Sequence, residues 1–193
     1  MKTNIPIFLF ILFLNIPHIG CTEKKIKAEI NDSPHTFCNP VNLNYRFIKK
    51  ENGAGAREGA DPVVTYFKGN YYLFVSKSGG YWYSSDFNNW KFVPISEDVL
   101  PIEDYAPATY VHNDSIYYVG SIWTSPSTLY RSAEPEKGIW EPIAEINSFW
   151  DPGFFVEGNN LYLYYGCSSV TPIRGITLDL NTLEEKGKPE DVI

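Results

Sequence analysis

The 193-residue sequence has few basic residues and no cluster of them beyond the pairs Lys24-Lys25 and Lys49-Lys50. Its 16 lysine and arginine residues face 23 aspartate and glutamate residues, which gives a formal net charge of −7. Because phosphate binding needs a basic surface, nucleic acid is excluded as a predicted partner. An uncharged ligand such as a sugar suits this composition better.

The sequence also has no apolar run long enough to span a bilayer. The segment from Ile5 to Ile16 is apolar, but it is interrupted by Pro6 and Asn15. With a lysine before it, this segment is typical of a secretory signal, which we assign to residues 1–20. We therefore expect an exported bacterial protein that is periplasmic, attached to the cell surface or secreted.

Cysteine is scarce, with three residues. Cys21 ends a segment, 19–21, that resembles a bacterial lipoprotein cleavage site, in which Cys21 would carry the lipid. His18 departs from that motif, which normally has an apolar residue there, so the sequence does not decide whether Cys21 is lipidated. A lipid on Cys21 is the only membrane attachment that we expect. Cys38 and Cys167 do not indicate a disulfide by their spacing, and we expect them to be buried free thiols.

For two segments before Pro62, the sequence predicts no helix or strand. Residues 21–35 are charged and polar and contain proline, which is typical of a tether. Residues 53–59 come near a dinucleotide-binding fingerprint, but the third glycine is one residue too far on and a strand pattern follows where a helix is required. A loop is therefore predicted for 53–59.

No stretch of helical periodicity is long enough to compete with the strand pattern, and the sequence contains an internal repeat. Pro62, Pro107 and Pro152 are spaced by 45 residues, and each is followed by a turn and then, ten residues on, by a tyrosine. Three units in register at this period indicate a repeat architecture. Each unit holds about four short strand-like segments, so residues 36–193 are predicted to be all-β: a β-propeller of four-stranded blades, with about three blades present.

Two carboxylates occupy equivalent places in this repeat. Asp61 and Asp151 stand directly before the first and third of the spaced prolines, where the second unit has Ala106. The start of the innermost strand of a propeller blade lies at the mouth of the central funnel, so Asp61 and Asp151 are predicted to point to one site. Capping of a local turn is the alternative role for such an aspartate. Glu103 and Asp104 are interpreted as loop charges.

Four segments together resemble glycoside hydrolase family 43. They are Arg-Glu-Gly-Ala-Asp-Pro at 57–62, Lys-Ser-Gly-Gly-Tyr-Trp at 77–82, Tyr-Ala-Pro at 105–107 and Asp-Pro at 151–152. The resemblance covers roughly residues 36–193. It implies a five-bladed propeller that acts on polysaccharides containing arabinose or xylose.

The resemblance also implies a mechanism, which is inverting hydrolysis by three carboxylates. Asp61 matches the general base that activates a water, and Asp151 matches the aspartate that tunes the pKa of the acid. The acid itself is a glutamate of the fourth blade. Inversion leaves room for the water, so base and acid carboxyls stand about 6.5–9.5 Å apart. A neighbouring carboxylate raises the pKa of the acid by repulsion between like charges.

Four further residues lie within or beside these motifs and are predicted to bind substrate. Trp82 and Trp150 could stack on the C–H face of a sugar, although packing in the core is the alternative for any aromatic residue here. Arg57 could donate to a sugar hydroxyl or pair with the glutamate beside it. Tyr105 opens the motif of the second unit.

No glutamate in the sequence matches the family's general acid. Glu157 falls in a predicted hairpin turn, and residues 184–185 fall in a connection. A fourth unit would begin near position 197, 45 residues after Pro152. We therefore expect a truncated form that does not hydrolyse glycosides alone.

Two other functions remain open. One is a carbohydrate-binding propeller without catalysis. The other is a retaining propeller acting on fructans, in which the aspartate of the first blade is a nucleophile, but Asp61 lacks the Asn-Asp-Pro-Asn type of surroundings. No cofactor and no metal site are assigned, and the sequence does not show whether calcium occupies the axis.

Overall fold

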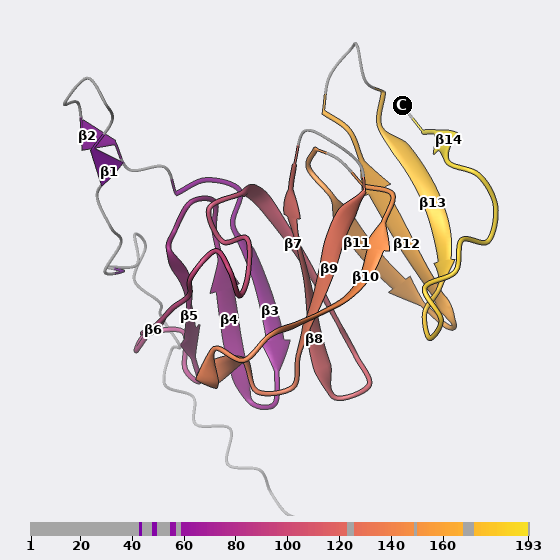
Figure 1. Ribbon diagram of the computed structural model, residues 1–193. Coiled ribbons are helices and arrows are strands. Elements are labelled where there is room, and N and C mark those ends of the chain that lie inside the picture. The colour runs from indigo at the N-terminus through magenta and orange to yellow at the C-terminus, as the bar shows by residue number, and fades with distance from the viewer. Residues whose placement is uncertain are drawn as a thin grey trace, which may run out of the picture. The chain divides into compact units, whose positions relative to one another are not determined.

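The computed structural model describes residue 43 and residues 48–49, 55–56, 59–122, 126–148, 150–167 and 172–192. Within these residues the chain is all-β, with three four-stranded antiparallel sheets and one short 3-10 helix, η1 (Pro135–Lys137) (Figure 1). Each sheet corresponds to one repeat of the sequence. The predicted architecture, a partial β-propeller with about three blades, is confirmed.

In each blade the four strands are neighbours in the sheet in the same order as in the chain. The first blade contains β3 (Val63–Phe67), β4 (Asn70–Phe74), β5 (Gly80–Ser84) and β6 (Lys91–Pro94). The second contains β7 (Tyr105–His112), β8 (Ser115–Ser121), β9 (Ser127–Ser132) and β10 (Glu141–Ile146). The third contains β11 (Gly153–Glu157), β12 (Asn160–Tyr165), β13 (Arg174–Asp179) and β14 (Glu190–Asp191). Strands β3, β7 and β11 contact one another in turn, so they are the innermost strands.

The first hairpin of each blade turns where the repeat predicts. Lys68 and Gly69 have φ of 46° and 83°, and Asn113 and Asp114 have φ of 43° and 62°. Positive φ at both central residues defines the type I′ turn, whose twist matches that of the strands it joins. In the third blade the turn between β11 and β12 contains Gly158, also at positive φ.

The second blade is buried on both faces because it lies between the other two. All residues of β8 are buried, and their side chains alternate between two cores. Ile116 and Tyr118 join the cluster shared with the first blade, whereas Tyr117 and Val119 join the cluster shared with the third. A strand buried on both faces needs no polar alternation, which explains the unbroken apolar run of β8.

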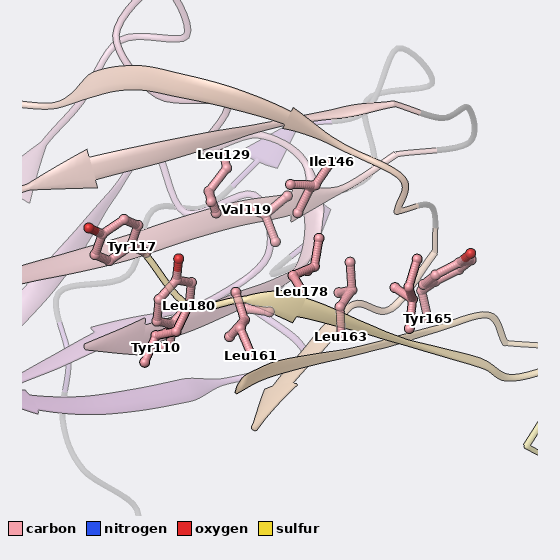
Figure 2. Packing of buried hydrophobic residues seen from close by; sticks show 12 residues of the cluster. Tyr110, Tyr117, Val119, Leu129, Ile146, Leu161, Leu163, Tyr165, Leu178 and Leu180 are labelled. Atoms are coloured by element: carbon pink, nitrogen blue, oxygen red, sulfur yellow. The ribbon is translucent and has the colours of Figure 1, made fainter. Parts of the chain in front are cut away.

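The cluster between the second and third blades is made of aliphatic and tyrosine side chains. In Figure 2, Val119 and Leu129 of the second blade point toward Leu161, Leu163 and Leu178 of the third. These five side chains are 0–2 % exposed. Full burial of one such side chain contributes about 1.5–3 kcal/mol, so this contact holds the two blades together.

The first and third blades each expose apolar side chains on their other face. Val64 and Tyr66 of β3 are 44 % and 61 % exposed, and Phe155 and Tyr164 of the third blade are 56 % and 39 % exposed. In β3 these residues alternate with side chains that face the second blade. Patches of this kind usually mark a surface that another element covers.

Strand β1 (Ile48–Lys49) pairs with β2 (Gly55–Ala56), so the predicted loop at 53–59 contributes two residues to a strand pair. The signal segment, Cys21, the tether, Cys38 and Arg57 lie outside the described residues. In the part of the chain that is described, no helix has the length and hydropathy of a membrane span.

Candidate active site

The residue before each repeated proline has the same unusual backbone conformation. Asp61, Ala106 and Asp151 have φ of 50°, 36° and 46°. Positive φ is uncommon for residues other than glycine, and a following proline disfavours helical conformations further. Such a residue costs about 1–3 kcal/mol and persists only where the surrounding structure holds it, as active sites often do. The repeat thus forms three strained turns at the starts of β3, β7 and β11.

Hydrogen bonds hold these turns at both ends. Ala60 and Trp150, each one residue before an aspartate, accept backbone hydrogen bonds from Ser76 at 3.0 Å and from Gly166 at 2.8 Å. Asp61 Oδ2 accepts from the Ser76 hydroxyl at 3.0 Å. The Asp151 amide donates to the hydroxyl of Ser121 at 2.9 Å. The two carboxylates are therefore presented on fixed backbone, as a catalytic group requires.

The Asp61 and Asp151 carboxylates interact electrostatically, although two blades separate them in the sequence. The pKa of Asp151 is raised, first by burial of its carboxyl and then by the charge of Asp61. A backbone hydrogen bond offsets part of this rise. Asp151 as a whole is exposed, so its burial is only partial. Repulsion of this kind requires proximity, and the structure therefore brings the two predicted carboxylates to one region.

Two of the predicted substrate-binding aromatics flank these turns at equivalent places. Tyr105 precedes Ala106 and is 45 % exposed, with Lys77 Nζ 4.4 Å from the centre of its ring. Trp150 precedes Asp151 and is half-buried. Its backbone amide donates to the Ile122 carbonyl at 3.0 Å. Both positions lie beside the region of the two carboxylates.

The structure corrects the prediction for Trp82. This residue is 1 % exposed, and its ring packs against Phe92 with centroids 5.0 Å apart. A ring with almost no exposed surface cannot receive a sugar, so Trp82 is a core residue of the first blade. Its place at the end of the motif at 77–82 did not distinguish it from the core aromatic residues around it.

Cys167 also differs from its prediction. It is a free thiol, as expected, but it is exposed rather than buried. The pKa of the Cys167 thiol is raised by desolvation and by the Asp151 carboxylate, which places Cys167 close to Asp151. Cys167 lies two residues after β12, at the end of that strand where β11 begins.

Asp104, interpreted from the sequence as a loop charge, is half-buried beside the second blade. Its pKa is raised to about 6, mainly by burial and then by Glu97, while Lys77 lowers it. A side chain at Gly120 would come within 2.9 Å of the Asp104 Cβ, so the lack of one there leaves room for the carboxyl. No spacing in the sequence signals this contact, because it depends on the loop between β6 and β7 folding back.

Of the glutamates weighed from the sequence, Glu157 lies at the opposite end of β11 from Asp151. Glu157 ends β11, which begins just after Asp151, and six residues of extended strand span roughly 20 Å. Glu185 accepts from the side chain of Asn147. Among the described residues, no group of three or more histidine, cysteine, aspartate or glutamate side chains is placed to hold a metal ion.

Comparison with solved structures finds this fold in glycoside hydrolases. An exo-1,5-α-L-arabinanase from a bovine ruminal metagenomic library is 22 % identical with a TM-score of 0.54 and matches 70 % of this chain and 55 % of its own. A GH43 protein from Bacillus licheniformis is 20 % identical with a TM-score of 0.55, over 81 % of this chain and 33 % of its own. A xylan β-1,4-xylosidase from Bacillus halodurans C-125 is 16 % identical with a TM-score of 0.53, over 81 % and 34 %.

No protein-family model and no curated protein matches the sequence. The chain spans about half of the arabinanase and about a third of the other two structures. The likeness shows the fold: the chain resembles the propeller of glycoside hydrolase family 43, as its motifs indicate.

Proposed function

We propose that this chain is a glycoside hydrolase-like domain of the inverting, family 43 type. The observation that carries the proposal is the electrostatic contact between Asp61 and Asp151 across alternate blades. The proposal is supported by the place of these two carboxylates, at residues of positive φ where inner strands start.

In this proposal Asp61 is the general base. It is exposed, so a water can reach it, and the Ser76 hydroxyl holds one of its carboxylate oxygens. The water that Asp61 deprotonates attacks the anomeric carbon from the side opposite to the leaving group, which inverts the configuration. Asp151 holds negative charge near the acid and raises its pKa, so that the acid is protonated when substrate binds.

The acid itself would be a glutamate supplied by a further blade. Two observations support this part of the proposal. The two described glutamates nearest in sequence to Asp151 are Glu157, at the far end of β11, and the exposed Glu145, which accepts from the Thr128 hydroxyl. The first and third blades also expose apolar side chains, including Tyr66 and Phe155, on faces that further blades would cover. We therefore propose a truncated or split form that does not hydrolyse glycosides alone.

The proposed substrate is a polysaccharide or oligosaccharide containing arabinose or xylose. The solved structures with this fold include an arabinanase and a xylan xylosidase. Tyr105 and Trp150, beside the two carboxylates, would contact the sugar ring, and an aromatic face suits the C–H groups of a sugar. Arg57, four residues before Asp61, would donate to a sugar hydroxyl.

A carbohydrate-binding propeller without catalysis is the second candidate. It is favoured by one observation, that Glu157, the next glutamate after Asp151 in the chain, lies at the far end of β11. Such a protein would keep the exposed Tyr105 and the half-buried Trp150 for binding and would need no acid.

The test begins with the DNA that follows the coding sequence. A further repeat that starts with a glutamate is expected there, and its absence would contradict the truncation. The protein that includes this repeat is then assayed on aryl arabinofuranosides and xylosides. Asp61→Asn is expected to lower kcat about 10²–10⁴-fold, the usual contribution of a general base. Asp114→Asn, at an exposed hairpin turn, is the matched control and should leave kcat unchanged.

Two outcomes separate the candidates. Loss of hydrolysis in Asp61→Asn, with a product of inverted configuration by NMR, supports the hydrolase. Oligosaccharide binding that Asp61→Asn leaves unchanged, without hydrolysis in either protein, supports the binding module.

We also propose export, with residues 1–20 as the signal and Cys21 as the lipid-bearing residue. Mass spectrometry of the mature N-terminus tests this directly. A diacylglyceryl group on Cys21 is the expected result, and cleavage elsewhere without a lipid would contradict the anchor but not the export.

A further inference from the structure

Ser76 is a fully buried polar residue that joins two blades at the mouth. It follows β4 and is 0 % exposed. Its hydroxyl donates to Asp61 Oδ2 at 3.0 Å and accepts from the Ala106 amide at 3.0 Å, while its own amide donates to the Ala60 carbonyl. A buried hydroxyl needs such partners, because leaving it without them is costly.

The same link recurs one blade further on. Ser76, Ser121 and Gly166 are spaced by 45 residues, and each lies 15 residues after one of the three strained turns. Ser121 accepts from the Asp151 amide as Ser76 accepts from the Ala106 amide. In both cases a hydroxyl of one blade holds the strained turn of the next.

The first blade alone combines this hydroxyl with a carboxylate in its own turn. In the second blade Ser121 stands with Ala106, which has no carboxyl. In the third blade Asp151 stands with Gly166, which has no hydroxyl. Asp61 therefore accepts a hydrogen bond from a hydroxyl that has no equivalent in the third blade, where Gly166 stands at that position of the repeat.

We propose that Ser76 is a positioning residue that orients the Asp61 carboxylate and couples it to the backbone of Ala106 in the second blade. The hydrogen bond from the Ser76 hydroxyl fixes the direction of the carboxylate oxygen that accepts it. The negative charge in turn polarises the hydroxyl and strengthens the bond that it accepts from Ala106. The role of Asp61 as a base rests on the proposed function, but the coupling does not.

NMR of the full chain tests this coupling without sugar or turnover. Asp61→Asn removes the charge, so the amide proton resonance of Ala106 is expected to move. In the Ser76→Ala background the same replacement should leave that resonance in place. Ser76→Ala alone should speed hydrogen exchange of the Ala106 amide roughly tenfold, the factor for loss of one hydrogen bond strengthened by charge.

Ser121→Ala is the matched control. It should move the Asp151 amide and leave the Ala106 amide and the Asp61 carboxyl carbon unchanged. The proposal is overturned if Asp61→Asn shifts Ala106 equally with and without the Ser76 hydroxyl, or does not shift it.

A second measurement covers the case in which Ser76→Ala does not fold. In the unmodified chain, the Ala106 amide resonance should titrate with the same midpoint as the carboxyl carbon of Asp61. Different midpoints would overturn the proposal. Because none of these readouts depends on catalysis, their failure is distinguishable from failure of the hydrolase assay.

Discussion

The carboxylate of Asp61 in the first blade raises the pKa of Asp151 in the third, although 90 residues separate positions 61 and 151 in the sequence. The second blade lies between them in the chain. It has Ala106 at the equivalent position, so it contributes no carboxylate there. The strained turns direct both aspartates to one end of the inner strands. A pair of like charges held together at a cost in free energy is typical of a functional site.

The stability of the chain should depend on pH through Asp104. Its pKa is about 6 in the folded protein against 3.8 ordinarily, so between these values the folded state binds more protons than the unfolded state. Stability is therefore expected to fall as pH rises from 4 to 6 and to be flat above. After allowance for solvent screening the loss is about 1–2 kcal/mol.

Urea unfolding at pH 4, 5, 6 and 7 measures this dependence. Asp104→Asn should remove most of the slope, and Glu97→Gln should shift it to lower pH, because Glu97 raises the pKa of Asp104. A slope that Asp104→Asn leaves unchanged would assign the titration to another group.

Replacement of the two predicted sugar-stacking tryptophans should have unequal effects on stability. Trp82→Ala removes a ring that is 1 % exposed and is expected to cost about 3–5 kcal/mol. Trp150→Ala, at a half-buried site, should cost clearly less. Urea unfolding of both variants checks the difference. Equal losses would mean that Trp150 is a core residue as well.

The contact between the second and third blades should carry much of the stability. Leu129→Ala in β9 creates a cavity in the cluster of Figure 2 and is expected to cost about 2–5 kcal/mol. Ile139→Ala, at a side chain that is 57 % exposed, is the control and should change stability by less than about 0.5 kcal/mol. A small effect of Leu129→Ala in thermal unfolding would contradict tight packing of these blades.

Much of the fold was predictable because the repeat is marked by residues whose preferences are local, such as turn residues and prolines. The turn residues at 68–69 and 113–114 are suited to positive φ, and the spacing of Pro62, Pro107 and Pro152 fixes the period. These signals act within a few residues and do not depend on distant contacts. The hairpins that they predict are confirmed. The two carboxylates were predictable for the same reason, since each stands at a fixed place in its repeat.

The burial of individual side chains was not predictable, because it depends on how strands and loops pack and no local signal encodes this packing. Trp82 was assigned to the sugar site although it packs against Phe92, and the choice depends on which face of the first blade it occupies. The half-buried state of Asp104 and the exposure of Cys167 depend on how loops fold back. Ser76 was also missed, although its 45-residue match with Ser121 was a signal that could have found it.

The pKa of Asp151, measured by carbon-13 NMR of its carboxyl in the unmodified chain and in Asp61→Asn, tests most directly whether the two aspartates share one site. The pKa should be above the ordinary value in the unmodified chain and should fall in Asp61→Asn, because one of its two causes has been removed while burial remains. Asp114→Asn, at the exposed turn of the second blade, should leave it unchanged. A pKa of Asp151 that does not respond to Asp61→Asn would contradict the shared site and the hydrolase proposal with it.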